Sequence, residues 1–188
     1  MNPIEFQLKQ LAGLFSATKI DYAILGGVAV SIYGEPRLTL DIDVNLVLDM
    51  EDIDNFLNKA KRFGFLPLAK NIKKFIKATG VIPMRFSKKA IVGRCDFIIS
   101  QNALEYAGIR RARSKKINST RIRLISPEDL IIHKITSERP RDIEDVRGIL
   151  LRQKGRLDLD YITSWLKRIS KTTKEKELLN SFKALVRS

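Results

Sequence analysis

The chain has 188 residues and a formal net charge of +14, with 44% hydrophobic and 30% charged residues, a composition typical of a soluble globular protein that excludes a disordered chain. No apolar run approaches the roughly 20 residues that span a bilayer, and one cysteine with one histidine excludes an internal disulfide and a zinc cage. Because the N-terminus lacks the basic and apolar regions of a signal peptide, the sequence predicts a cytoplasmic protein without a membrane partner.

The first part of the chain predicts alternating helices and strands. In chain order, apolar spacing and turn residues predict a helix over residues 4–18, a strand over 22–25, a short helix over 28–33, a strand over 40–48 and a helix from 49 to about 63. The pair Gly26-Gly27 stops the first strand, and Pro36 prevents the short helix from continuing. This alternation indicates an α/β core.

Residues after 80 predict further strands and then helices only. Two strands are expected within 81–99, the second over 90–99, and two short strands around 112–117 and 120–125. Ser126-Pro127-Glu128-Asp129 marks a helix start, with serine as N-cap and proline at the first helical position. From there to the end the pattern is helical, with a break near Gly155. We therefore predict an α/β core over residues 1–125 and a helical subdomain over 126–188.

Positive charge is concentrated in two stretches. Lysines at near-helical spacing occupy residues 70–77, and the segment 108–123 contains no acid but seven basic residues: Arg110, Arg111, Arg113, Lys115, Lys116, Arg121 and Arg123. Polyanions bind such patches because each neutralised phosphate releases counterions. Nucleic acid or nucleotide is the predicted partner, and a merely solubilising surface is the alternative.

Two carboxylates lie close together in the strand predicted over 40–48. Side chains alternate along a strand, so Asp41 and Asp43 share one face, with Cα atoms about 6.6 Å apart. A divalent cation would turn their repulsion into an attraction, and Mg²⁺ prefers carboxylate oxygens together with substrate phosphates. A chance Asp-x-Asp on a solvent-facing strand is the alternative. A calcium loop is excluded because Leu46 stands where that loop needs glycine.

Gly26-Gly27 precedes a predicted helix, so backbone N–H groups at this junction could bind anionic oxygens. The surrounding residues match neither the dinucleotide-binding Gly-x-Gly-x-x-Gly pattern nor a P-loop. A simple tight turn is the alternative. A phosphate binder followed by a metal binder is what a nucleoside triphosphate with Mg²⁺ requires.

A third carboxylate would complete a two-metal site, in which one ion activates the nucleophile. Asp96 is a lone acid within the apolar strand predicted over 90–99, where an unpaired carboxylate is costly. An edge-strand or turn position is the alternative explanation.

These motifs together resemble the polymerase-β-type nucleotidyltransferase superfamily. Leu25-Gly-Gly27, thirteen further residues, Asp41-Ile-Asp43 and the later Asp96 follow its pattern. Gly-Gly-x-Ala, Tyr-Gly-x-Pro-Arg-x-Thr and Asp-Ile-Asp-Val are similar to the AbiEii-like branch, which includes toxins, and so are the segments 125–134 and 139–145. The resemblance covers roughly residues 22–150. Gly27 departs from the serine of many relatives, which removes a hydroxyl near the phosphates.

The resemblance implies a mixed β-sheet packed with helices, followed by an all-helical C-terminal part. It implies that Asp41, Asp43 and Asp96 hold two Mg²⁺ ions and that the amides of Gly26, Gly27 and Val28 bind the β- and γ-phosphates of an NTP. The remaining implied site residues are Arg37 and Lys134 as cationic contacts to the triphosphate, and Arg139, Asp142 and Asp145, the two acids being placed to orient Lys134 or Arg139. For Asp142 and Asp145, an exposed helix carrying ion pairs is the alternative.

The implied activity is Mg²⁺-dependent transfer of a nucleoside monophosphate from an NTP to an acceptor hydroxyl, with release of pyrophosphate. The basic segment 108–123 favours RNA, such as a tRNA 3′ end, and the AbiEii-like motifs suggest a toxin with an antitoxin protein as partner. A protein hydroxyl is the second acceptor class, and an aminoglycoside is the third because a cationic drug suits a basic surface poorly. The alternative from another class is a non-catalytic module of the same fold that binds nucleotide, nucleic acid or an antitoxin.

Overall fold

The computed structural model describes residues 2–39, 41–137, 139–173 and 177–187. The chain divides into two compact units. The first, the sheet unit, comprises Met1–Val28 and Thr39–Ile125, and the second, the helical unit, comprises Ala29–Leu38 and Ser126–Ser188. The chain therefore leaves the sheet unit after Val28 and returns to it at Thr39.

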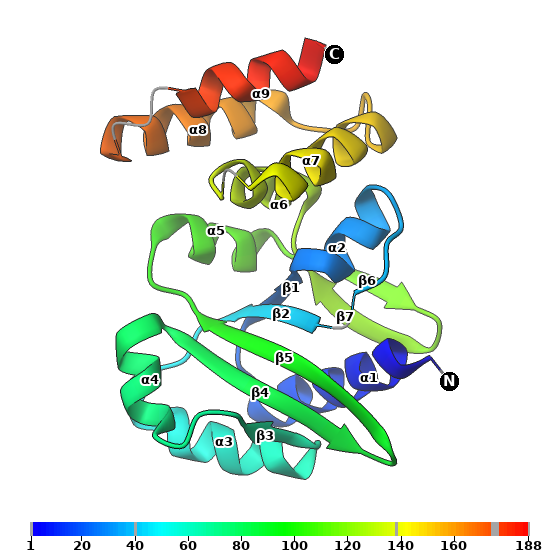
Figure 1. Cartoon of the computed structure of the whole chain (residues 1–188), viewed down its shortest axis with the longest axis vertical. Helices are drawn as coiled ribbons and strands as arrows, with labels where there is room; N and C mark the ends of the chain where they lie inside the picture. The colour runs from blue at the N-terminus through cyan, green and yellow to red at the C-terminus, as the bar shows by residue number, and fades with distance from the viewer. Residues whose placement is uncertain (1, 40, 138, 174–176, 188) are drawn as a thin grey trace. The chain divides into compact units, whose positions relative to one another are not determined.

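The sheet unit contains a seven-stranded mixed sheet in the order β3-β4-β5-β2-β1-β7-β6 (Figure 1). The strands are β1 (Tyr22–Leu25), β2 (Asp41–Leu46), β3 (Phe65–Pro67), β4 (Val81–Lys88), β5 (Ile91–Ile99), β6 (Arg113–Ile117) and β7 (Thr120–Leu124). Strand β2 runs parallel to β5 and β1 runs parallel to β7, while the other neighbours are antiparallel. The mixed α/β fold that the sequence predicts is thus confirmed.

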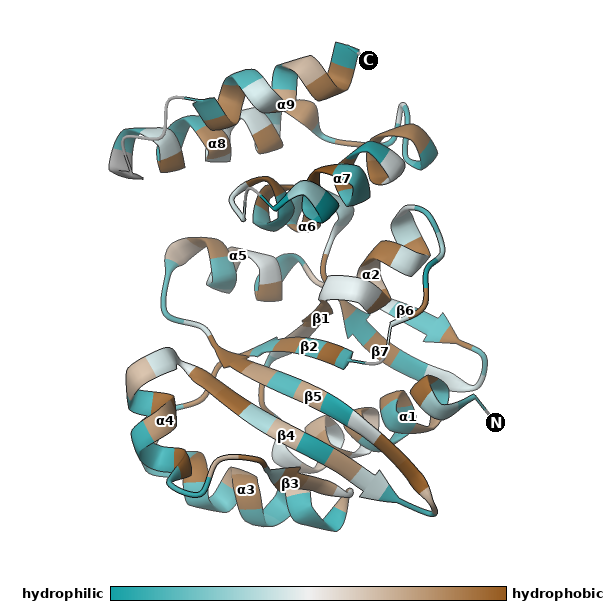
Figure 2. Cartoon of the chain, viewed as in Figure 1, coloured by the Kyte–Doolittle hydropathy of each residue, from teal (hydrophilic) through white to brown (hydrophobic). Residues whose placement is uncertain are grey.

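One face of this sheet packs against α1 (Pro3–Thr18) and α3 (Ile53–Arg62) and forms the apolar core with them. Phe97 on β5 is fully buried and makes edge-to-face ring contacts with Phe15 of α1 and Phe56 of α3. Val44 on β2 is the register partner of Phe97 and is also fully buried. Because side chains alternate between faces, every second residue of β2 and β5 points away from this core. Strands β4 and β5 accordingly show hydrophobic and hydrophilic stripes in Figure 2.

The predicted elements of this unit are present with small shifts at their ends. The helix predicted over 28–33 is α2 (Gly26–Tyr33), so the glycine pair forms the first residues of the helix rather than a turn before it. Strand β2 ends at Leu46, two residues earlier than expected, and Leu40, the expected first residue, lies outside the described residues. The helix expected from residue 49 begins as a 3-10 turn, η1 (Met50–Asp52), and continues as α3.

Three elements were not predicted: β3, α4 (Ile72–Thr79) and α5 (Ala103–Arg111). Both helices carry recognisable ends. The Asn71 side chain accepts a hydrogen bond at the start of α4, and a capping box of Asn102 and Glu105 opens α5. The caps are therefore the sequence signals that would have located these two helices.

The helical unit contains α6 (Pro127–Ile135), α7 (Pro140–Arg152), α8 (Leu159–Thr173) and α9 (Glu177–Arg187). The predicted helix start is confirmed, because the Ser126 hydroxyl accepts a hydrogen bond of 3.1 Å from the backbone N–H of Asp129. The predicted break is confirmed as well, since Gly155 lies between α7 and α8 with φ of +74°. No helix among the described residues is long and apolar enough to cross a membrane.

Candidate active site

Three carboxylates lie on the sheet face that points away from the apolar core. In the parallel register of β2 and β5, Asp43 is the partner of Asp96 and Asp41 is the partner of Arg94. Their strand neighbours Ile42 and Cys95 are fully buried on the core side. Residues directly opposite in register share a face, and so do residues two apart in one strand. The register therefore places Asp41, Asp43 and Asp96 together, on what we call the carboxylate face.

The glycine pair lies directly against one of these carboxylates. Gly26 has φ of +62°, and a Cβ atom added there would lie 1.8 Å from Oδ2 of Asp43. Only glycine satisfies both conditions, because the left-handed backbone disfavours other residues and the carboxylate leaves no space. A Cβ atom added at Gly27 would lie 2.6 Å from Oγ1 of Thr39, so the side chain of Thr39 fills the space beside that glycine. Asp43 thus lies at the start of α2.

Arg94 is a member of the carboxylate face that the sequence analysis missed. Its Nε donates to Oδ1 of Asp96 at 3.1 Å and its Nη2 donates to Oδ2 at 3.0 Å, a two-pronged ion pair. The pKa of the Arg94 guanidinium is raised, chiefly by these hydrogen bonds and the charge of Asp96, with smaller contributions from Asp41 and Asp43. The available signal was the spacing, because residues 94 and 96 of one strand share a face.

The carboxylate face has the chemistry that Mg²⁺ requires. Its donors are hard carboxylate oxygens, and the Asp43 carboxylate lies against Gly26, where any side chain would displace it. Among the described residues, no group of three or more His, Cys, Asp or Glu side chains is already gathered closely enough to hold a metal ion. The carboxylate of Asp96 is paired with Arg94 instead. The residue types fit the ion, and Asp96 would have to exchange Arg94 for it.

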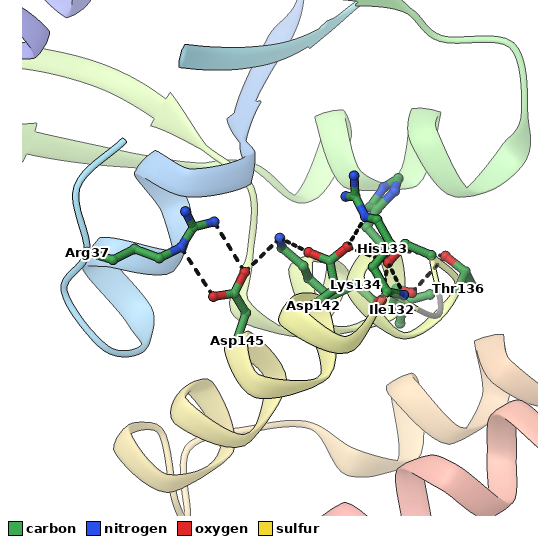
Figure 3. A network of polar contacts seen from close by, with 9 residues as sticks. Arg37, Ile132, His133, Lys134, Thr136, Asp142 and Asp145 are labelled. Carbon is green, nitrogen blue, oxygen red and sulfur yellow. Dashed lines mark hydrogen bonds and ion pairs between the residues drawn. The ribbon is translucent and has the colours of Figure 1, made fainter. Parts of the chain in front are cut away.

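The helical unit brings together the other predicted site residues (Figure 3). Lys134 of α6 is buried and its Nζ forms ion pairs with Asp142 and, at 2.8 Å, with Asp145, both on α7. Arg37 approaches Asp145 from the other side, with Nε 3.3 Å from Oδ1. A row of alternating charges results, Arg37–Asp145–Lys134–Asp142. The two acids hold Lys134 in one orientation, and all four residues belong to the same unit.

Asp142 ends this row and has the most partners. Besides Lys134, it accepts hydrogen bonds from the Ser137 hydroxyl and, at 2.6 Å, from Nε of Arg139. Burial by itself would raise the pKa of the Asp142 carboxyl, but the hydrogen bonds from Lys134, Ser137 and Arg139 outweigh it and keep the pKa below the ordinary value. Asp142 is therefore a buried carboxylate that stays ionised, whereas Arg139 is largely exposed.

Comparison with known proteins agrees with the motifs. Residues 109–187 match a family model described as nucleotidyltransferase of unknown function, DUF6036. The matched range includes the helices after residue 155, which lie outside the part of the chain that the motifs cover. Comparison with curated proteins gives no significant match. The matched family supports the broad class and does not name the AbiEii-like branch.

Solved structures with similar folds share little sequence with this chain. An antigenic nucleotidyltransferase-like protein from Paracoccidioides brasiliensis is 19% identical, with 94% of this chain and 93% of the other covered and a TM-score of 0.55. The antibiotic-resistance factor ANT(2'')-Ia is 14% identical, with coverage of 93% and 97% and a TM-score of 0.58. The lincosamide antibiotic adenylyltransferase LnuA, solved with lincomycin, is 16% identical, with coverage of 76% and 94% and a TM-score of 0.50. The family model over residues 109–187 and the folds of these structures agree with the nucleotidyltransferase fold that the motifs predict.

Proposed function

We propose that this chain transfers a nucleoside monophosphate from an NTP to an acceptor hydroxyl and releases pyrophosphate. The observation that carries the proposal is the register of Asp43 and Asp96 on neighbouring parallel strands, with Gly26 packed against the Asp43 carboxylate. An acidic pair beside a helix start combines a cation site with an anion site. A purely structural sheet has no use for three carboxylates on one face, because they repel one another.

Each proposed role follows from the position of the residue. Asp41, Asp43 and Asp96 are the proposed ligands of two Mg²⁺ ions, which when bound would offset the charge of the triphosphate and lower the pKa of the attacking hydroxyl. The backbone amides of Gly26, Gly27 and Val28, in the first turn of α2, are the proposed partners of the β- and γ-phosphates.

Lys134 and Arg37 are the cationic contacts to the triphosphate that the family resemblance implies, and we keep them as proposals. Asp142 and Asp145 are proposed to orient Lys134 through the ion pairs that they form with it. Arg139, paired with Asp142 and largely exposed, is a further proposed contact. A lysine held between two carboxylates is already oriented, so little conformational entropy is lost when it binds a phosphate.

RNA, such as a tRNA 3′ end, is the proposed acceptor. The hairpin of β6 and β7 places Lys116 directly opposite Arg121, and both are exposed. Like charges in register destabilise a hairpin unless an anion lies between or above them. The AbiEii-like motifs add the proposal that the chain acts as a toxin with an antitoxin protein as partner.

A small antibiotic is the second candidate acceptor, favoured by the fold neighbours ANT(2'')-Ia and LnuA, which are an antibiotic-resistance factor and an antibiotic adenylyltransferase. Nucleotidylation of a protein hydroxyl is a further candidate. A non-catalytic module of the same fold that binds nucleotide, nucleic acid or an antitoxin is the alternative outside enzymology.

One labelling experiment separates these candidates. The protein is incubated with Mg²⁺ and each labelled NTP in turn, in separate reactions with total RNA, cell lysate protein, an aminoglycoside or a lincosamide. We expect label to enter RNA, and Asp41→Ala to abolish the transfer while the protein stays folded. Asp54→Ala is the matched control, because Asp54 lies on α3 and its one ion pair within the described part of the chain is with the exposed Lys73. Absence of transfer to every acceptor would favour the binding-module alternative.

A further inference from the structure

Two arginines extend the carboxylate face toward β4. In the antiparallel register of β4 and β5, Arg85 lies directly opposite Arg94, which in turn lies opposite Asp41 of β2. The strand neighbours of Arg85 are Met84 and Phe86, which are both fully buried on the core side. Arg85 therefore shares the outer face with Arg94. Across the sheet, Arg85, Arg94 and Asp41 form one transverse row, beside the row that contains Asp96 and Asp43.

The two arginines are held together without an acid between them. Directly opposite side chains have Cβ atoms about 5 Å apart, and like charges in this position are destabilising. Arg94 is neutralised by Asp96, but Arg85 is exposed and has no ion-pair partner among the described residues. Arg85 therefore places an uncompensated positive charge next to the carboxylates. An anion bound from outside the chain would compensate this charge.

We propose that Arg85 and Arg94 form a binding site for a phosphate group of the acceptor, so that the acceptor is a phosphodiester-bearing RNA. This inference rests on the function proposed above and narrows its acceptor class. A guanidinium presents its N–H groups in a planar fork that matches two phosphate oxygens. Two such forks side by side can bind one phosphate from both sides.

The position of the row relative to the carboxylates fits an RNA end. The reacting hydroxyl has to reach Asp41, Asp43 and Asp96, and a terminal ribose carries its own phosphodiester a few bonds from that hydroxyl. Arg94 is the immediate register neighbour of Asp41, so a phosphate bound there lies one strand from the reacting group. An aminoglycoside carries positive charge itself, so this row would repel it.

Arg94 cannot bind a phosphate with its full charge while its guanidinium is paired with Asp96, as it is in the structure. If Asp96 serves as a metal ligand, its negative charge is shared with the ion, and its hold on Arg94 weakens. Arg94 then becomes available to the acceptor phosphate. Arg85 has no carboxylate partner among the residues that the structure describes, so a change in its phosphate binding is easier to interpret and it is the better residue for testing the site.

The test is the affinity for a fluorescein-labelled single-stranded RNA of roughly 10 nucleotides, measured by fluorescence anisotropy with Mg²⁺ and without NTP. For Arg85→Ala we expect roughly three- to tenfold weaker binding, and a plot of log K against log salt whose slope is smaller by about 1. Arg94→Ala should behave in the same way, and Arg85→Lys should retain part of the affinity. Lys61→Ala is the matched control, because it removes one exposed positive charge from α3 on the core side of the sheet.

The outcomes separate this inference from the proposed function. If Arg85→Ala leaves the RNA affinity and the salt slope unchanged, or if the wild-type protein binds no RNA, the inference is wrong even when nucleotide transfer is observed. If RNA binding depends on Arg85 but no nucleotide is transferred, the inference stands and the proposed function fails. Where transfer to RNA occurs, Arg85→Ala should raise the KM for RNA and leave the KM for NTP unchanged. Transfer to protein that depends on Arg85, without RNA binding, also overturns the inference.

Discussion

Asp43 on β2 and Asp96 on β5 are partners in the register of two parallel strands, although 52 residues separate them in the chain. This pairing puts two carboxylates side by side on the carboxylate face of the sheet. Arg94 then forms its two-pronged ion pair with Asp96, and Gly26 makes room for Asp43. The strand register brings the two carboxylates together. The positive charge of Arg94 reduces their repulsion, and the missing side chain of Gly26 leaves room for the Asp43 carboxylate.

Replacing Asp96 by asparagine should weaken metal binding without unfolding the protein. Asp96→Asn keeps the shape of the side chain and one acceptor oxygen for Arg94 but removes the negative charge. The Arg94–Asp96 pair is partly exposed, with Arg94 52% accessible, so its loss should cost at most about 1 kcal/mol of unfolding free energy. We expect the affinity for Mn²⁺, titrated by electron paramagnetic resonance, to fall by at least roughly tenfold. Asp54→Asn is the control, and equal Mn²⁺ affinity in wild type and Asp96→Asn would exclude Asp96 as a ligand.

Gly26→Ala should destabilise the sheet unit by more than backbone strain alone. An alanine with left-handed φ costs about 1–2 kcal/mol, and the added Cβ would also push the Asp43 carboxylate away, since it would lie 1.8 Å from Oδ2. Gly155→Ala isolates the strain, because Gly155 has φ of +74° and no atom within 4 Å of an added Cβ. Urea unfolding should show a larger loss of unfolding free energy for Gly26→Ala than for Gly155→Ala. Transfer activity should be lost in Gly26→Ala and kept in Gly155→Ala. Equal losses in the two variants would mean that the contact with Asp43 contributes nothing.

Lys134→Ala should be strongly destabilising, because Asp142 and Asp145 would stay buried without the cation between them. Breaking a buried pair by removing one partner costs about 3–5 kcal/mol, and the remaining contacts to Arg37 and Arg139 put the expected loss at the lower end. Arg139→Ala is the comparison, since the exposed Arg139 contacts the same Asp142 and should cost at most about 1 kcal/mol. Chemical denaturation at neutral pH measures both. A small loss of unfolding free energy for Lys134→Ala would show that the buried row of charges does not stabilise the fold.

The Asp142 carboxyl should make the helical unit sensitive to acid. Its pKa is lower in the folded chain than its ordinary value of 3.8, because burial is outweighed by the hydrogen bonds from Lys134, Ser137 and Arg139. A group with a depressed folded-state pKa stabilises the fold above its unfolded pKa, and this contribution is lost as the pH falls through the folded-state value. We expect the difference in unfolding free energy between wild type and Asp142→Asn to be constant above about pH 5 and to shrink below about pH 4. A difference that does not depend on pH would contradict the assignment.

Local patterns predicted much of this protein. A short apolar run that stops at the glycine pair located β1, alternation located β2, and the Ser126-Pro127 start located α6. These signals are local, because strand faces and helix caps are set by residues close in sequence. The helices α4 and α5 were missed although they begin with asparagine caps. Both helices are short, so their apolar periodicity is weak, and their basic residues were interpreted as patches of positive charge that bind polyanions. The asparagine cap is therefore the stronger signal for each helix.

The sequence by itself determined the residue types of the site: a glycine pair before a helix, two acids on one face of a strand, and a lone acid in a later strand. Only the tertiary structure decided which residues meet. The hydrogen-bond ladder between β2 and β5 sets Asp43 beside Asp96, and the ladder between β5 and β4 sets Arg94 beside Arg85. Arg37 reaches Asp145 across 108 residues. Periodicity is a property of one segment, whereas register and ion pairing depend on how separate segments pack, so no single stretch of sequence contains them.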